Sequence, residues 1–271
     1  MPNSAIYPIH LCQPDDRKSC GACCGLFNYQ DHSRASLQSL LKKRTEFFEK
    51  FGTEDQIEEY RKGSNSIVAS PKLFEKIYNC EFLGFLDQGH RQVGCLLHPA
   101  RNNGEDLRNH SFYGADLCAG HLCPSYTYLT VFEQKAVATV LDDWYIYGLV
   151  ITDIDLVKEF FRHAQTRLGD SIHPVRLETD AVKNSLRDFF VLKENWPFVS
   201  TENRLGKYYF SHSEYQIARI EYEKKWKIKP SRFDKILVSL SSDFSSLEEV
   251  HKAETLIEEK IEAFLTAYQG S

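Results

Sequence analysis

The distribution of cysteine along the chain is the feature that most limits what this sequence can fold into. Eight cysteines lie within the first 123 residues, and none occurs from Pro124 to Ser271. An even number of cysteines indicates disulfides in a small secreted domain, whereas in a cytosolic chain it favours metal ligation or thiol chemistry. The first sixteen residues contain neither a basic segment nor an apolar one, so we expect no secretory signal and a cytoplasmic protein. We therefore expect the thiols to hold a metal, with thiol redox chemistry, disulfides and buried core cysteines as alternatives.

Composition and charge exclude several classes of protein. The chain has 271 residues, of which 42% are hydrophobic and 26% charged, enough to bury a core of globular type. Its net charge of -5 argues against a general partner made of nucleic acid or anionic lipid. No apolar run approaches the roughly 18–20 residues that a membrane span needs. A basic cluster lies at residues 224–232 and is typical of a solvated helix end. We expect no nucleic acid and no membrane as partners.

The densest cysteine segment has the sequence SCGACCG, at residues 19–25. Two cysteines separated by two residues can bend around one ion, and the glycines let backbone N–H groups approach the sulfurs. Adjacent side chains tend to diverge, so Cys23 and Cys24 are not expected to occupy ordinary positions on one tetrahedral ion. Either one of them is structural, or the site is larger than a single ion. Eight thiols suffice for two centres with four cysteines each, or for one such centre with additional cysteines.

Softness of the donors limits the choice of metal. Thiolates select zinc, Cu(I) or iron–sulfur clusters, and they make magnesium or calcium improbable. Two of the histidines among the cysteines are candidate ligands: His98 follows Cys95 by three residues, and His121 lies between Cys118 and Cys123. Whether either imidazole is a ligand stays open at this point, as does the choice between a structural and a catalytic metal.

Three cysteine blocks in order resemble a known family. The segment CGACCG at residues 20–25, then CEFL at 80–83, then GCLLHP at 94–99, followed by two more cysteines, resemble the YkgJ-like cysteine-cluster family, a zinc- or iron-chelating CxxCxxCC domain. The resemblance extends from about Cys12 to Pro124. It departs from the family at Arg17, where the motif would have its first cysteine, and Cys12 is the candidate to replace it. The expected metal ligands are Cys20, Cys23, Cys24, Cys80, Cys95 and Cys118 in the first rank, and Cys12 and Cys123 in the second.

The resemblance also carries functional alternatives. The main expectation is a protein that chelates zinc or an iron–sulfur cluster. Because the same type of domain resembles part of the flagellin lysine N-methylases, an iron–sulfur-dependent protein-modifying enzyme is an alternative. A thiol–disulfide redox protein based on the CxxC segment is a second alternative, although a polar stretch precedes that segment where a thioredoxin-type site would have an apolar strand.

The residue pattern of the sequence changes after the last cysteine, Cys123. We expect an α+β, mostly helical fold, with an irregular cysteine-rich metal-chelating domain over residues 1–124 packed on a helical domain over residues 125–271. The first domain should contain an amphipathic helix near residues 36–51 and a β-hairpin of residues 78–86 and 91–97. That hairpin would bring Cys80 and Cys95 to within a residue or two of facing positions.

Helical periodicity dominates the second domain. Apolar residues recur at helical spacing over five segments, at residues 132–144, 154–168, 181–192, 214–226 and 247–268. Gly169 should end the second of these helices, and Ser246 with Glu249 forms a capping-box pattern at the start of the last. A protein partner that binds through this helical domain is compatible with the pattern.

Overall fold

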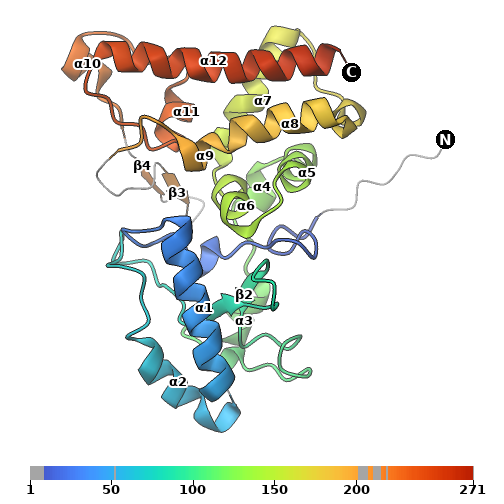
Figure 1. The fold of residues 1–271 in the computed structure, drawn as a ribbon, viewed down its shortest axis with the longest axis vertical. Coiled ribbons are helices and arrows are strands. Elements are labelled where there is room, and N and C mark those ends of the chain that lie inside the picture. Colours follow the sequence, from blue (N-terminus) through green and yellow to red (C-terminus); the bar gives the residue numbers. More distant parts are fainter. Residues whose placement is uncertain (1–8, 52, 201–206, 210–214, 218, 271) are drawn as a thin grey trace, which may run out of the picture. The chain divides into compact units, whose positions relative to one another are not determined.

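The computed structural model describes residues 9–51, 53–200, 207–209, 215–217 and 219–270 (Figure 1). These ranges are mostly helical and contain two antiparallel two-stranded sheets, which confirms the α+β class at this level. The chain divides into two compact units. The cysteine unit comprises residues 10–123 and 143–148, and the helical unit comprises the remaining residues of the chain. The expected domains, 1–124 and 125–271, stay a prediction.

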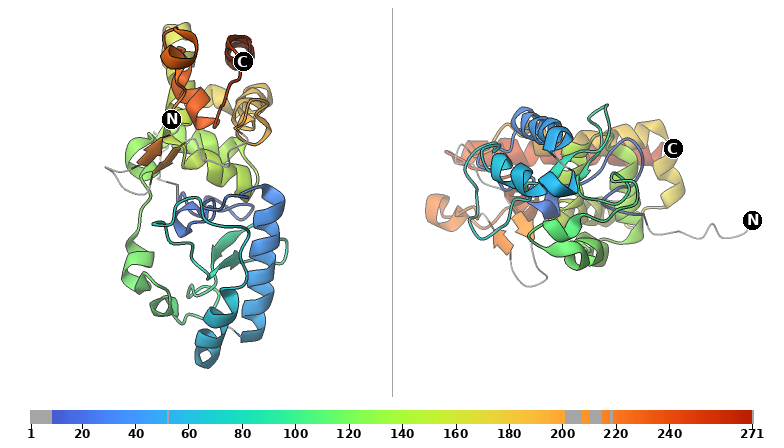
Figure 2. Two further views of the ribbon diagram at one scale, coloured as in Figure 1. Left: turned by 90° about the vertical axis from the view of Figure 1, so that its left-hand side faces the viewer. Right: turned by 90° about the horizontal axis from the view of Figure 1, so that it is seen from below.

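The cysteine unit is built around one long helix and a short hairpin (Figure 2). Helix α1 packs against strand β1 and helix α2, as its predicted apolar stripe requires, and Leu37, Leu40, Leu41 and Phe48 of that stripe are buried. The elements of this unit are η1 (Ala22–Cys24), α1 (Arg34–Phe51), η2 (Glu54–Gln56), α2 (Ile57–Ser64), β1 (Leu83–Phe85), β2 (Val93–Cys95), η3 (Arg108–His110) and α3 (Gly114–Gly120).

The hairpin is shorter than predicted, and its register differs. Leu83 pairs with Cys95, so Cys80 lies three residues before the residue that faces Cys95. Tight turns at the two cysteines limit the strands. The Leu83 N–H donates to the Cys80 carbonyl at 3.4 Å, and the His98 N–H donates to the Cys95 carbonyl at 3.2 Å. Cys80 and Cys95 therefore lie at one end of the hairpin, each beside a turn, and do not face one another.

The helical unit packs its helices around a cluster of phenylalanines. Helix α12 packs along α8 and also contacts α7 (Figure 1). The ring of Phe160 in α7 lies 4.4 Å from that of Phe189 in α8 and 5.0 Å from that of Phe264 in α12. Within the described residues, no helix is both long enough and apolar enough to cross a membrane. The elements from residue 124 onward are α4 (Ser125–Tyr128), α5 (Val131–Val140), α6 (Trp144–Ile151), α7 (Ile154–Leu168), η4 (Pro174–Glu178), α8 (Asp180–Phe190), α9 (Leu192–Asn195), β3 (Lys207–Tyr209), β4 (Tyr215–Ile217), α10 (Tyr222–Trp226), α11 (Asp234–Ser239) and α12 (Leu247–Gln269).

Three of the five predicted helices are confirmed, namely those near residues 154–168, 181–192 and 247–268. The apolar stripe over 132–144 is divided between two helices, because the Asp143 carboxylate accepts from the N–H groups of Tyr145 and Ile146 and starts α6 there. The prediction for 214–226 is wrong in its first part. Residues 215–217 form a strand paired with 207–209, and only Tyr222–Trp226 is helical. Residue 214 lies outside the described residues.

Candidate metal site

The densest cysteine segment folds as the short 3₁₀ turn η1, which ends at a glycine in the left-handed region. Gly25 has φ of +79°, and a Cβ atom at this position would lie 2.4 Å from the Tyr78 carbonyl oxygen. This close approach lets the Cys80 N–H donate to the Cys24 carbonyl at 2.9 Å. Gly25 thus allows two cysteine blocks that are 56 residues apart in sequence to meet.

Four cysteines form a first thiol group, defined as Cys12, Cys20, Cys23 and Cys123. The Cys20 N–H donates to the Cys12 carbonyl at 2.9 Å, which joins two of them through the backbone. Cys23 and Cys123 share a hydrogen bond between their side chains. Burial and the nearby Cys123 thiol raise the pKa of Cys12 to about 11. Burial and then the thiol of Cys12 raise the pKa of Cys20 well above its usual range.

The other four cysteines form a second thiol group, defined as Cys24, Cys80, Cys95 and Cys118. Cys24 and Cys95 pack against the hydrophobic cluster to which the buried Cys80 belongs. Burial and then the thiols of Cys95 and Cys118 raise the pKa of Cys24 to about 12. The Cys118 sulfur lies 3.5 Å from the Ser111 hydroxyl at the edge of this group. The structure therefore brings together all eight cysteines singled out in the sequence, in two neighbourhoods of one unit.

These cysteines are all free thiols. Burial is the largest cause of the raised pKa of five of them, while the hydrogen bond with Cys123 is the largest cause for Cys23. At neutral pH these six side chains are protonated. Among the described residues, no three side chains of His, Cys, Asp or Glu are arranged so that they could hold a metal ion as they stand. The fold gathers the thiols in one unit, and the described residues form no ready coordination geometry for a metal.

The two candidate histidine ligands, His98 and His121, are both exposed. The Nδ1 atom of His98 accepts from the Ala100 N–H at 3.1 Å, which occupies one ring nitrogen. Burial and then the Arg108 guanidinium lower the pKa of His98, with Asp106 opposing them. The backbone N–H of His121 donates to the Leu117 carbonyl at 3.0 Å and so caps α3. Neither observation brings an imidazole to a thiol.

A buried arginine beside the second thiol group was not anticipated from the sequence. Arg44 in α1 is only 3% exposed. Its Nη1 atom donates to the Cys80 carbonyl at 2.8 Å and its Nη2 atom to the Tyr29 hydroxyl at 3.1 Å. Its Nε atom is buried without a hydrogen-bond partner among the described residues. The sequence does contain a signal, because Arg44 lies on the same helical stripe as Leu41 and Phe48 and is therefore directed to the core.

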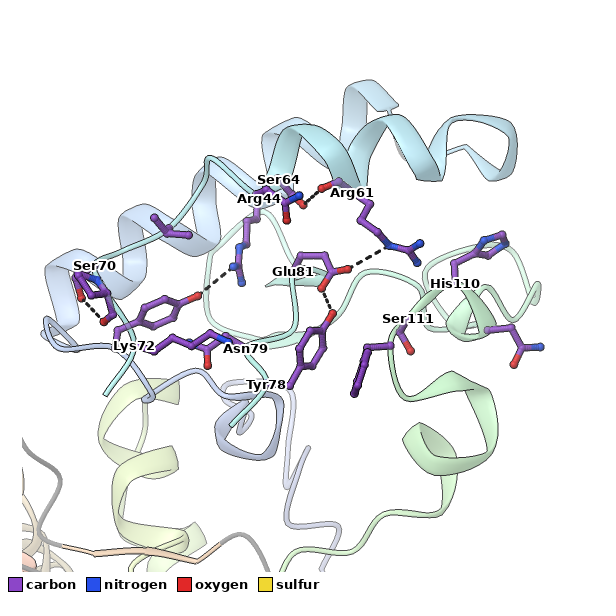
Figure 3. Close-up of a pocket in the computed structure, with 16 residues that line it drawn as sticks. Arg44, Arg61, Ser64, Ser70, Lys72, Tyr78, Asn79, Glu81, His110 and Ser111 are labelled. Carbon is purple, nitrogen blue, oxygen red and sulfur yellow. Dashed lines mark hydrogen bonds and ion pairs between the residues drawn. The ribbon is translucent and has the colours of Figure 1, made fainter. Parts of the chain in front are cut away.

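A pocket of about 900 Å³ also lies in the cysteine unit. Arg44 and Lys72 contribute to its lining, as does Glu81, which follows Cys80 directly in the chain (Figure 3). The Arg61 guanidinium lies 3.4 Å from the Glu81 carboxylate, which also accepts a hydrogen bond from the Tyr78 hydroxyl. The pocket thus presents charged and hydroxyl groups next to a candidate metal ligand, and no sequence motif indicated it.

Comparison with known protein families, with curated proteins and with solved structures finds no match to this chain. The resemblance to the YkgJ-like family therefore depends on the cysteine motifs alone and stays a prediction.

Proposed function

We propose that this chain is a metal-binding protein that holds zinc or an iron–sulfur cluster through cysteine thiolates. The observation that carries the proposal is the convergence of eight free cysteines in a single unit. They come from distant parts of the sequence, between residues 12 and 123, and each has other thiols as neighbours. Soft sulfur donors of this kind select zinc, Cu(I) or iron over magnesium and calcium.

The donor set fits such a metal in number and chemistry. Four thiols complete a tetrahedral zinc site or the cysteine ligation of an iron–sulfur cluster. Because the thiols are protonated in the metal-free chain, binding would release protons, and the sulfurs would have to turn toward a common point. Two cations would offset the charge of the resulting thiolates: Arg44, at the Cys80 carbonyl, and Arg108, which interacts with Cys95 and Cys118.

The YkgJ-like resemblance agrees with this proposal, since that family chelates zinc or iron through the same cysteine motifs. Two further expectations belong to the proposal. One is that the protein works in the cytoplasm, where thiols stay reduced and available to a metal. The other is that the helical unit offers a surface to a protein partner.

Substitution of one cysteine from each group tests the proposal. Cys20→Ser and Cys95→Ser should each lower the metal content of anaerobically purified protein, because serine is a poor ligand for soft metals. His98→Gln is the matched control and should keep its metal, since the His98 ring already accepts a backbone N–H. Elemental analysis and circular dichroism on the same samples separate loss of metal from loss of fold. Metal content equal to that of the wild type in both cysteine variants would refute the proposal.

An enzymatic role is the second candidate, and the pocket beside Cys80 is the observation that favours it. The resemblance to part of the flagellin lysine N-methylases implies an iron–sulfur-dependent protein-modifying enzyme that uses S-adenosylmethionine. Calorimetric titration of metal-loaded protein with S-adenosylmethionine should then give heat, which Glu81→Gln should reduce. No heat with the wild type would remove this candidate.

The thiol–disulfide redox alternative has less support. A redox-active CxxC site needs a cysteine whose pKa is lowered, so that the thiolate is present at neutral pH. Burial raises the pKa of Cys20 well above its usual range, and the hydrogen bond with Cys123 does the same for Cys23.

A further inference from the structure

Cys23 and Cys24 are adjacent in the chain, yet the structure places them in different surroundings. Cys23 is exposed and shares a hydrogen bond with Cys123. Cys24 is half-buried and packs against the hydrophobic cluster that contains Cys80. Both lie in η1, and successive side chains of a 3₁₀ turn point about 120° apart. The turn η1 therefore directs the Cys23 thiol toward Cys123 and the Cys24 thiol toward the hydrophobic cluster that contains Cys80.

Backbone contacts group the cysteines in the same way. The Cys20 N–H donates to the Cys12 carbonyl, and the Cys80 N–H donates to the Cys24 carbonyl, both at 2.9 Å. Each of these bonds joins members of one thiol group. Cys95 is added to Cys24 and Cys80 because it packs against the same hydrophobic cluster.

Cys118 is associated with the second thiol group through an arginine. The Arg108 guanidinium pairs with Asp106 and also interacts with Cys95 and Cys118. The Cys118 sulfur itself lies 3.5 Å from the Ser111 hydroxyl.

We propose that the eight cysteines build two separate four-thiol metal sites, one in each thiol group, and that Cys23 and Cys24 serve different sites. This inference rests on the proposed function and deepens it. Each group supplies the four donors of a closed tetrahedral site. Each Zn²⁺ bound would displace up to four protons, one from each thiol, as four sulfur–zinc bonds form. Cys23 and Cys24 would then bind two different metal ions and would not compete for positions on one.

Metal titration of matched variants tests this assignment. Reduced, metal-free full-length protein should bind two equivalents of Zn²⁺, or of Co²⁺ followed by its thiolate absorption. Cys23→Ser and Cys24→Ser should each bind one equivalent. The double variant Cys23→Ser/Cys123→Ser, altered within one group, should keep one equivalent. The double variant Cys23→Ser/Cys24→Ser, altered across the groups, should keep none.

A second measurement uses the wild-type chain, so that a variant that fails to fold leaves the test intact. Protein loaded with one equivalent of Zn²⁺ is treated with a thiol-alkylating reagent, and molecules with four unmodified cysteines are fragmented in a mass spectrometer. The four protected residues should all belong to one thiol group.

The possible failures are distinguishable. Protection of Cys23 and Cys24 in the same molecule, a wild type that binds one equivalent, or equal residual binding by the two double variants would overturn the two-site assignment and leave the proposed function standing. No binding of Zn²⁺ or Co²⁺ by the wild type, together with no iron and no acid-labile sulfide in the protein purified without oxygen, would overturn both.

Discussion

Arg44 links helix α1 to the second thiol group through buried hydrogen bonds. Its guanidinium is 3% exposed and reaches both the Cys80 carbonyl and the Tyr29 hydroxyl. A buried polar group that loses its partner costs about 1–3 kcal/mol, because the hydration lost on folding is no longer replaced. The side chain therefore stabilises the position of Cys80 as well as supplying charge.

Replacing the Arg44 side chain should destabilise the protein. Arg44→Met should lower the free energy of unfolding by about 1–3 kcal/mol, measured by urea denaturation of metal-free protein. Lys43→Met is a matched control on the same helix, at an exposed position, and should change stability by no more than about 0.5 kcal/mol. Equal stabilities of the two variants would contradict the structural role of Arg44.

Helices α1 and α7 could be predicted from the spacing of apolar residues, whereas the register of the β1–β2 hairpin could not. Helix α1 and helix α7 follow from apolar residues at helical spacing, and Gly169 ends α7 with φ of +66°. The hairpin register does not follow, because it depends on turns at Cys80 and Cys95 that form through backbone hydrogen bonds. The strand at residues 215–217 does not follow from the sequence either, because a three-residue strand has too little periodicity to be distinguished from the helix next to it.

The gathering of the cysteines in one unit could be predicted from the sequence, whereas their grouping could not. Cysteine spacing alone singled out all eight thiols, because thiols concentrated in one part of a chain are chemically distinctive; that they are metal ligands stays a prediction. Their division into two groups depends on contacts between residues far apart in sequence, such as Cys24 with Cys80. Spacing contains no information about such contacts, and the pocket next to Glu81 was missed for the same reason.

The contact between η1 and the segment before β1 depends on a glycine. Gly25→Ala should destabilise the protein and weaken metal binding, because its Cβ atom would lie 2.4 Å from the Tyr78 carbonyl oxygen at a positive φ. Gly104→Ala is the control: its φ is also positive, at +94°, but no atom lies within 4 Å of the added Cβ. Thermal unfolding and Zn²⁺ titration should show the larger loss in Gly25→Ala. Equal losses would mean that only backbone strain matters and that the close approach does not.

At the scale of the whole molecule, the thiols couple stability to pH. Burial raises the pKa of Cys12 and Cys95 from 9.0 to about 11. Above pH 9 the folded metal-free chain therefore binds more protons than the unfolded chain, so the contribution of these thiols is complete below pH 9 and is lost as pH rises toward 11. Urea denaturation of metal-free protein should show stability falling across this window.

Bound metal should remove the loss of stability between pH 9 and 11. In metal-loaded protein the thiols are already deprotonated, so the thiol contribution should be flat between pH 9 and 11, while acidification should release the metal. The same denaturation series with and without a chelator provides the comparison. Stability curves of identical shape in the two series would show that the cysteines do not bind the metal.

If the cysteine unit holds metal through its thiols, as we propose, the purified protein should contain that metal. The protein should be purified without oxygen or chelator, analysed for zinc, iron and acid-labile sulfide, and examined in visible light. Stoichiometric metal is expected: zinc in colourless protein, or iron with sulfide and a broad absorption band at about 400 nm. Protein that is folded, retains eight reduced cysteines and contains no metal, before or after incubation with Zn²⁺, would contradict it.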